Sequence, residues 1–495
     1  MVRLAIDLQE TAQWGAKFLY LITIITLFLG IYLHPGYIVL FVIFGILSGF
    51  NFYLKNIQTK HALLRNFGIL ATVRYFMESI GPEMRQYFYL SDTEERPFNR
   101  TERADVYRKS KNIDSTESFG TQLDIDKGAT MLRHSMFPLS KKDVEEFSLT
   151  FGDERKLKSQ FTINKAIMIS AMSFGSLGAN AVMALSLGAH KAGIPINTGE
   201  GGLSTYHLSG GADVIYQMGT AKFGCRNNDG TLNEEKFQKI AQTHQVKMVE
   251  IKFSQGAKPG KGGLLPKEKI TEEIAKIRHV GMDKDVVSPS RHMECDNPKN
   301  TVKFIKKIQD LSELPVGIKF CLGDIKEFSV LIKEMKKQKV FPDYIAVDGA
   351  EGATGAAPKS FMDNVGVPLF ASLKQVCNVL EKEKVRNKLK VVASGKLINP
   401  GKQIAALATG ADAIYTARGF LLSLGCIQAL QCNKGTCPAG ITTHDPVLQR
   451  GLDVEAKSER VYNYVKNSNY EFKELLSALG VKNASKLGIQ HLYHS

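Results

Sequence analysis

Two neighbouring stretches decide the fold: LKVVASGKL at residues 389–397 and ADAIYTARG at residues 411–419. Each is a short run of apolar and β-branched residues that ends in small or polar residues with a glycine, the pattern of a buried strand entering a loop. A helical stretch separates the two runs. Strands that alternate with helices predict parallel βαβ units.

The same alternation extends through the chain from residue 160. Five further runs predict strands: AIMISA at 166–171, PINTG at 195–199, VKMVEIKF at 246–253, PVGIKF at 315–320 and DYIAVDG at 343–349. No G-x-G-x-x-G motif follows the first of them, so a dinucleotide-binding open sheet is not indicated. We therefore predict an α/β protein whose residues 160–446 form a (β/α)8 TIM barrel with its active site at the carboxyl ends of the strands. A connecting helical or irregular segment over 57–159 and a helical tail over 447–495 would flank the barrel.

Glycines follow the last two predicted strands. At these positions, Gly395 and Gly419, barrels commonly bind phosphate through backbone N–H groups, which a ligand can approach only past a small residue. Ser394, Lys396 and Arg418 stand beside them, and the last two could add positive charge. Turning the chain is the alternative reason for a glycine at either position. The pair at this spacing favours phosphate binding.

Three cysteines lie close together in GCIQALQCNKGTCPAG, at Cys426, Cys432 and Cys437. Their C-x5-C-x4-C spacing, on a backbone that contains glycine and proline, favours an iron–sulfur centre, because soft sulfur ligands suit iron. They suit zinc equally, but zinc would need a fourth ligand, for which His444 is the obvious candidate. Three free buried thiols are the third alternative.

Two apolar runs stand at the N-terminal end, at residues 17–33 and 37–54, separated by a His-Pro-Gly turn. At 1.5 Å per residue each would span roughly 26 Å of a hydrocarbon core about 30 Å thick. Both are apolar on every face, which favours a transmembrane helical hairpin over residues 1–56 above a buried helix pair or a cleaved signal peptide. Basic residues follow the second run, so the positive-inside rule predicts a membrane-anchored protein with a cytoplasmic catalytic domain.

The composition excludes several classes of protein. Of the 495 residues 44% are hydrophobic and 23% are charged, which is typical of a folded globular chain. The net charge of +15 comes from lysines and arginines scattered among acidic residues, without a basic stripe interleaved with aromatics, so no nucleic acid partner is expected. Seven cysteines, all beyond residue 224, make a poor disulfide framework and favour a reducing compartment.

Five long motifs occur in order along the chain. They are SAMSFGSLG at 170–178, NTGEGG at 197–202, SQGAKPGKGGLLP at 254–266, DGAEGATGAAP at 348–358 and the cysteine segment at 426–440, which ends in CPAG. Together they resemble the FMN-binding synthase domain of glutamate synthase, and the resemblance covers residues 160–446. The N-terminal hairpin resembles that of the short, membrane-anchored relatives of this family.

The resemblance implies two cofactors, FMN and a 3Fe-4S cluster. It implies the cluster on Cys426, Cys432 and Cys437. The flavin-binding residues that it implies are Ala171, Met172, Ser173, Lys319, Gly352, Ser394, Gly395, Lys396, Arg418 and Gly419. A lysine at a strand end, such as Lys319, can place positive charge beside the flavin and stabilise its reduced form.

The resemblance also implies a substrate side formed by Glu200, Gln255 and Lys258. Amide and cationic donors suit a dicarboxylate such as 2-oxoglutarate. Glu200 would orient the imine or relay a proton, and with Lys319 it is an implied catalytic residue. Without the motifs, Lys258 would be interpreted as a solvated loop lysine and Glu200 as a carboxylate at a helix start. One departure is Ala353, where a second glycine is expected, because its methyl group could crowd the flavin or the substrate.

The implied reaction is the reduction of 2-iminoglutarate, formed from 2-oxoglutarate and ammonia, to L-glutamate by hydride from FMNH2 fed through the cluster. No cysteine precedes Cys225, so glutamine hydrolysis is not expected. Without a dinucleotide motif, electrons are expected from an external donor, a ferredoxin or a reductase subunit. Two alternatives are a membrane-tethered flavin and iron–sulfur dehydrogenase for another amino acid, and an electron-transfer subunit without its own substrate.

Overall fold

The computed structural model describes residues 2–126, 128, 130–265, 267 and 270–494. Pro266, the last residue of one motif quoted above, lies outside them. The chain divides into two compact units, Met1–Arg100 and Thr101–Ser495. The domain boundaries predicted at residues 56, 159 and 446 stay predictions.

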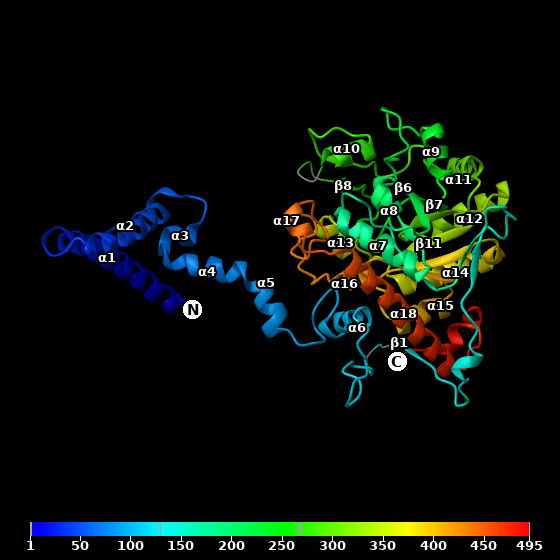
Figure 1. Ribbon diagram of the computed structural model, residues 1–495, viewed down its shortest axis with the longest axis horizontal. Coiled ribbons are helices and arrows are strands. Elements are labelled where there is room, and N and C mark those ends of the chain that lie inside the picture. The colour runs from blue at the N-terminus through cyan, green and yellow to red at the C-terminus, as the bar shows by residue number, and fades with distance from the viewer. Residues whose placement is uncertain (1, 127, 129, 266, 268–269, 495) are drawn as a thin grey trace. The chain divides into compact units, whose positions relative to one another are not determined.

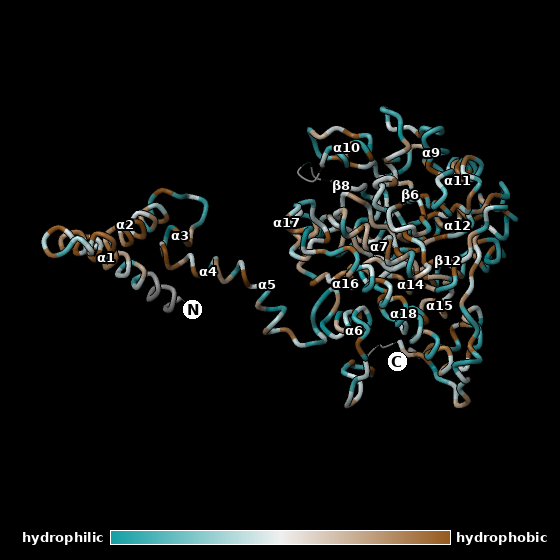
Figure 2. The backbone as a smooth tube through the Cα atoms, viewed as in Figure 1, coloured by the Kyte–Doolittle hydropathy of each residue, from teal (hydrophilic) through white to brown (hydrophobic). Residues whose placement is uncertain are grey.

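The first unit is helical. Its elements are α1 (Val2–Tyr32), α2 (Tyr37–Phe52), η1 (Tyr53–Ile57), α3 (Ala62–Phe67), α4 (Leu70–Ser79), α5 (Gly81–Met84) and η2 (Arg85–Tyr89), of which η1 and η2 are π-helical turns. Helices α1 and α2 pack against each other, and Figure 2 shows hydrophobic residues along both. Within the described residues, Glu10–Tyr32 and Tyr37–Ile57 are long and apolar enough to cross a membrane.

Eight parallel strands form a closed barrel in the second unit (Figure 1). They are β4 (Ile167–Ile169), β5 (Ile196–Asn197), β6 (Val214–Met218), β7 (Val246–Lys252), β10 (Val316–Phe320), β11 (Tyr344–Asp348), β12 (Lys390–Ser394) and β13 (Ala413–Thr416). Each pairs with the next along the chain, and β13 pairs with β4. The predicted (β/α)8 TIM barrel is confirmed.

One barrel strand, β6, was absent from the sequence prediction. Its five residues include the polar Gln217, so no long apolar run marks it, yet every one of them is buried. Strand β6 pairs with β5 and β7 and so supplies the barrel's missing side.

Helices follow the strands around the barrel. They are α7 (Ala179–Ala192), α8 (Thr205–Leu208), α9 (Glu234–Ala241), α10 (Glu272–Arg278), α11 (Pro298–Ser312), α12 (Ile325–Gln338), α13 (Lys359–Asn364), α14 (Leu369–Lys382), α15 (Pro400–Ala408) and α16 (Arg418–Leu424). A small hairpin of β8 (Leu264–Leu265) and β9 (Val286–Val287) stands in the long connection after β7. Beyond the barrel come α17 (Pro446–Gln449) and α18 (Val454–Leu479), and α18 packs on α7, α15 and α16. Strand β14 (Leu492–His494) pairs with β1 (Thr130–Leu132), and α6 (Arg100–Ser110) precedes them.

A hairpin of β2 (Leu149–Phe151) and β3 (Phe161–Ile163) closes the amino-terminal end of the barrel. Phe151 and Ile163 are buried in one cluster with residues of the barrel interior, such as Met168 and Tyr344. The ring centroids of Phe151 and Tyr344 are 5.4 Å apart. The barrel is therefore a packed core with its free end at the carboxyl side of the strands.

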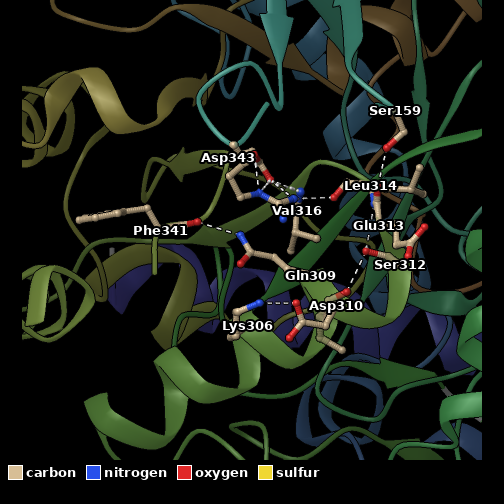
Figure 3. A network of polar contacts seen from close by, with 12 residues as sticks. Ser159, Lys306, Gln309, Asp310, Ser312, Glu313, Leu314, Val316, Phe341 and Asp343 are labelled. Carbon is tan, nitrogen blue, oxygen red and sulfur yellow. Dashed lines mark hydrogen bonds and ion pairs between the residues drawn. The ribbon is translucent and has the colours of Figure 1, made fainter. Parts of the chain in front are cut away.

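Polar contacts hold the β2–β3 connection to this end of the barrel (Figure 3). Arg155 donates from Nη2 to Asp343 Oδ2 at 2.8 Å and to Leu314 O at 2.8 Å. Asp343 Oδ2 also accepts from the N–H of Val316 at 2.7 Å, and Ser159 donates to Glu313 O. A carboxylate bonded to a guanidinium and a backbone amide is a strong, charge-assisted tether.

Candidate active site

Two neighbouring pockets lie at the carboxyl ends of the barrel strands. The β12–β13 pocket is lined by residues at the ends of β4, β6, β10, β11, β12 and β13. The Glu200 pocket lies between the loops that follow β4, β5, β6, β7 and β11. Ala171 lines the first pocket and Ser173 the second, just as Ala353 lines the first and Thr354 the second. The two pockets therefore share walls.

The β12–β13 pocket brings together most of the predicted flavin-binding residues. Those that line it are Ala171, Lys319, Gly352, Ser394, Gly395, Lys396 and Arg418. Ser173 lines the Glu200 pocket instead. Met172 is buried, and its N–H donates to Asn197 O at 3.3 Å. The first-strand loop thus passes from one pocket to the other.

Cations stand at the ends of β12 and β13. Arg418 donates from Nη2 to Glu351 O at 2.6 Å, and burial lowers its pKa to about 10. Burial and then the charge of Arg418 lower the pKa of Lys396. Gly395, with φ at +150°, lies between the strand and this lysine. Two cations beside the backbone of a glycine suit an anionic group such as a phosphate.

Gly419 has a packing role. A Cβ atom at this position would lie 2.5 Å from Tyr464 Oη and 3.0 Å from Thr416 Oγ1. The glycine therefore makes room for Tyr464 of α18, a reason that the phosphate interpretation did not include. The predicted contact of Gly419 with a phosphate stays a prediction.

Lys319 is a buried residue of the β12–β13 pocket. Lys319 Nζ is 4.0 Å from Asp348 Oδ2, and both side chains are buried. Gln217 and Gln255 line the same pocket. Gln255 was predicted on the substrate side with Lys258, but the structure places the two in different pockets.

Glu200 is surrounded by cations from other elements. It lies on the turn Gly199–Gly201, and its Oε1 is 2.9 Å from Lys252 Nζ at the end of β7. Burial favours the neutral acid, but the charges of Lys252, Lys258 and Arg278 outweigh it and bring the pKa of Glu200 below its ordinary value of 4.5. The carboxylate is therefore ionised at neutral pH.

The cations around Glu200 exceed its single negative charge. Lys258 is buried, donates to Ala356 O at 3.1 Å and has its pKa lowered to about 8 by burial, which excludes the solvated-loop interpretation. Arg278 donates to Phe174 O at 3.1 Å, and its guanidinium lies 5.3 Å from the centroid of the Phe223 ring. Excess positive charge in a buried pocket suits a ligand with carboxylate groups.

Glycines allow the loops to close on this centre. A Cβ atom at Gly219 would lie 2.7 Å from Glu200 Oε2. A Cβ atom at Gly256 would lie 2.1 Å from Gly349 O and 2.8 Å from Gly352 N. The glycine-rich motifs thus serve the contact between the loops after β7 and β11.

The three cysteines of the predicted cluster follow α16, and none of them forms a disulfide. Burial first, and then the nearby thiols of Cys432 and Cys437, raise the pKa of the Cys426 thiol to about 11. The N–H of Gln428 lies 3.4 Å from Cys426 Sγ. Although burial raises the pKa of Cys437, backbone hydrogen bonds, first that of Thr442, bring it below its ordinary value. Neighbouring sulfurs that accept backbone hydrogen bonds fit an iron–sulfur cluster.

His444 lies elsewhere. Its Nε2 is 3.1 Å from Gly175 O, and its ring meets that of Phe174 edge-on at 5.5 Å. In the part of the chain that the structure describes, no three His, Cys, Asp or Glu side chains are grouped to hold one metal ion. The structure thus gives no support to a zinc site completed by His444.

Sequence reasoning missed several residues around these pockets. Lys252 and Arg278 were not selected, although a lysine at the end of an apolar strand was a usable signal for the first. Tyr107 of α6 donates to Cys426 O at 2.5 Å, and the charge of the buried Arg103 partly opposes the rise that burial causes in the pKa of Cys426. No local motif could have indicated α6, because its partners lie far along the chain.

Comparisons with known proteins identify the family to which the chain belongs. Residues 99–482 match the family model described as the conserved region in glutamate synthase. The chain is 38% identical over 475 residues to the glutamate synthase large subunit-like protein YerD of Bacillus subtilis, covering 88% of this chain and 90% of that protein. It is 33% identical over 328 residues to the archaeal-type glutamate synthase (NADPH) of Thermotoga maritima, covering 66% of this chain and 61% of that protein.

The archaeal glutamate synthase (NADPH) of Methanocaldococcus jannaschii is 32% identical over 335 residues, covering 67% of this chain and 62% of that protein. The chain therefore spans less than two thirds of the length of these archaeal and archaeal-type relatives, but most of the Bacillus protein. Among solved structures, mandelate oxidase with benzoyl-formic acid aligns with a TM-score of 0.46 at 12% identity, over 79% of this chain and 98% of that chain. The family match over most of its length shows that this chain belongs to the glutamate synthase family of oxidoreductases.

Proposed function

We propose that this protein is an FMN-dependent glutamate synthase that forms L-glutamate from 2-oxoglutarate and ammonia with electrons from an external donor, a ferredoxin or a reductase subunit. The observation that carries the proposal is the pairing of two pockets with shared walls. One offers cations and the backbone of Gly395, and the other surrounds the Glu200 carboxylate with buried cations. A ligand in one pocket would lie beside a ligand in the other.

FMN fits the β12–β13 pocket. Its phosphate would lie at Gly395, Lys396 and Arg418, and its ring system would lie towards Lys319. Asp348, with Oδ2 at 4.0 Å, and the Tyr415 ring, with its centroid at 5.7 Å, hold Lys319 Nζ in place. The bound flavin supplies hydride transfer, and a fixed cation at Lys319 offsets the negative charge of its reduced form.

The substrate fits the Glu200 pocket. Lys258 and Arg278 would bind the carboxylates of 2-oxoglutarate, because their charges exceed what Glu200 compensates. Lys252 fixes Oε1 of Glu200, and the carboxylate lines the pocket, where it would orient the substrate nitrogen or hold a proton from it. In this assignment Glu200 is a catalytic residue and Lys252 a positioning residue.

The cysteine segment would hold a 3Fe-4S cluster on Cys426, Cys432 and Cys437, which would supply one-electron transfer. Two observations support it: backbone donors point at Cys426 Sγ and at the Cys437 sulfur, and Cys432 lines the Glu200 pocket. Electrons from the donor would therefore arrive next to the reacting groups.

The hairpin of α1 and α2 would anchor the protein in a membrane, with the barrel in the cytoplasm. The support is the length and apolar character of Glu10–Tyr32 and Tyr37–Ile57, and the basic residues that follow them, Lys55, Lys60 and Arg65.

A second candidate is the oxidation or formation of an amino acid with an apolar side chain. It is favoured by the apolar residues Phe223, Leu264 and Val286, which line the Glu200 pocket with the charged groups. In this case Arg278 and Lys258 would bind a single carboxylate.

The test is anaerobic purification followed by a visible spectrum, iron and sulfide analysis, and reoxidation of the reduced protein. Reoxidation by 2-oxoglutarate with ammonium supports the first function, and reoxidation only by a branched-chain 2-oxo acid with ammonium supports the second. Reoxidation by neither would indicate an electron-transfer subunit. Cys432→Ser should lose iron and keep flavin, whereas Cys295→Ser, outside the segment, should keep both.

A further inference from the structure

Helix α4 (Leu70–Ser79) presents an exposed apolar face. Leu70, Val73, Phe76 and Met77 are 49% to 61% exposed. With 3.6 residues per turn these positions share one side of the helix. Large apolar side chains grouped on a surface mark an interaction site.

The other side of α4 packs within the N-terminal unit. Ala71 is buried, and the Tyr75 ring meets the His61 ring at 5.2 Å between centroids. The charged pair Arg74 and Glu78 lies at the edge between the two sides, with 3.5 Å between the closest nitrogen and oxygen atoms. The apolar side is therefore directed away from the rest of its own unit.

Hydrogen bonds of Asn51 fix the start of α4 at one position along the helices α1 and α2. Its buried Oδ1 accepts from the N–H of Ile69 at 2.9 Å, and its Nδ2 donates to Tyr20 Oη at 3.2 Å. Asn51 is about one helical turn before Lys55, and Tyr20 is about one turn after Lys17. Helix α4 thus begins at the level of Lys17 and Lys55, the basic residues at one end of the two apolar runs.

Charge and aromatic residues support a lipid partner. Between residues 55 and 90 the basic residues are Lys55, Lys60, Arg65, Arg74 and Arg85, and the acidic residues are Glu78 and Glu83. Tyr87, Phe88 and Tyr89 are also exposed. Basic and aromatic residues beside an apolar span are typical of the membrane–water interface.

We propose that α4 is an interfacial helix that lies along the surface of an anionic bilayer with Leu70, Val73, Phe76 and Met77 in the acyl-chain boundary. The inference rests on the proposed membrane anchor, since α4 takes its depth from Asn51 of the hairpin. It adds a second attachment, which would fix the direction in which the chain leaves the membrane.

Fluorescence quenching by lipid tests the proposal. The full-length protein would be reconstituted in vesicles of phosphatidylcholine and phosphatidylglycerol whose acyl chains carry bromine. Trp14 is the one tryptophan of the sequence, so a Trp14→Phe background allows single reporters. The reporters are Phe76→Trp on the apolar face, Glu78→Trp on the charged side of the same helix and Phe28→Trp in the hairpin, all at exposed positions. Circular dichroism melting shows whether each variant folds.

We expect bromine to quench Phe76→Trp roughly threefold more strongly than Glu78→Trp, because only the first side chain enters the acyl region. Quenching of Phe28→Trp with equal, weak quenching at 76 and 78 would overturn the interfacial helix and leave the anchor in place. No quenching of Phe28→Trp would overturn the anchor itself. Emission from Phe76→Trp that is blue-shifted, unquenched and dependent on protein concentration would show that a second copy covers the face, which also overturns the proposal.

Discussion

The two pockets at the barrel mouth share loops but compensate charge differently. In the β12–β13 pocket Arg418 donates to a backbone oxygen, Lys319 lies 4.0 Å from Asp348, and the backbone of Gly395 forms part of the wall. In the Glu200 pocket a carboxylate from one turn meets cations from β7, its loop and α10. We conclude that the first pocket should respond to changes of backbone packing and the second to changes of single charges.

The largest effect is expected from Glu200→Gln. An amide at this position leaves the buried Lys252 without a negatively charged partner. This should lower the free energy of unfolding by about 3 kcal/mol, the lower end of the range for a buried ion pair, because the Glu200 side chain is one fifth exposed. Denaturant unfolding would measure this loss of stability, and flavin absorbance should show an unchanged flavin content. Glu272→Gln, an exposed carboxylate on α10, is the matched control. Loss of flavin from Glu200→Gln would contradict the separation of the two pockets.

The same carboxylate gives a pH dependence. Because the pKa of Glu200 is depressed in the folded protein, its stabilising effect is complete above the ordinary value of 4.5 and is lost as pH falls through the lower folded value. Unfolding of Glu200→Gln should therefore depend less on pH below 4.5. Identical acid profiles for both proteins would show that the ion pair is absent in solution.

Gly256→Ala should come next, at about 2 kcal/mol of destabilisation. Its Cβ atom would lie 2.1 Å from Gly349 O, so the loops after β7 and β11 must separate. Both loops line the pockets, so flavin retention and substrate binding should fall together, as flavin absorbance and KM would show. If the variant lost only flavin retention or only substrate binding, the contact between these two loops would not support both pockets.

Lys258→Ala should raise the KM for the oxo acid about tenfold, or about 1.4 kcal/mol, with an unchanged flavin spectrum. The exposed Lys261→Ala is the control. Since burial lowers the pKa of Lys258 to about 8, the KM of the unsubstituted protein should rise as pH passes that value and the lysine loses its proton. Lys258→Arg keeps its charge and should remove this alkaline rise; if the rise persists, another group causes it.

The smallest effect is expected from Ala353→Gly. Ala353 is exposed on the wall of the β12–β13 pocket, so removing its methyl group should change flavin affinity by less than about 1 kcal/mol. Flavin titration of the apoprotein would measure it. A larger gain in affinity would show that the methyl group crowds the ring.

Local patterns predicted the barrel but only part of the site. β12 and β13 were recognisable because each is a short apolar run with a glycine after it, whereas β6 carries a glutamine that interrupts its pattern. Lys258 stood in a glycine-rich motif, but Arg278 became its neighbour only through the fold. Tyr107 donates a hydrogen bond to Cys426, although 319 positions separate the two residues in the sequence, and local sequence patterns carry no information over such a separation.

The β2–β3 hairpin determines at which end of the barrel ligands can enter. Phe151 and Tyr344 fill the floor of the barrel, and both are fully buried. These packed rings close that end, so a ligand of either pocket would enter and leave at the carboxyl side of the strands. In the proposed reaction, substrate and product would therefore use the same entrance.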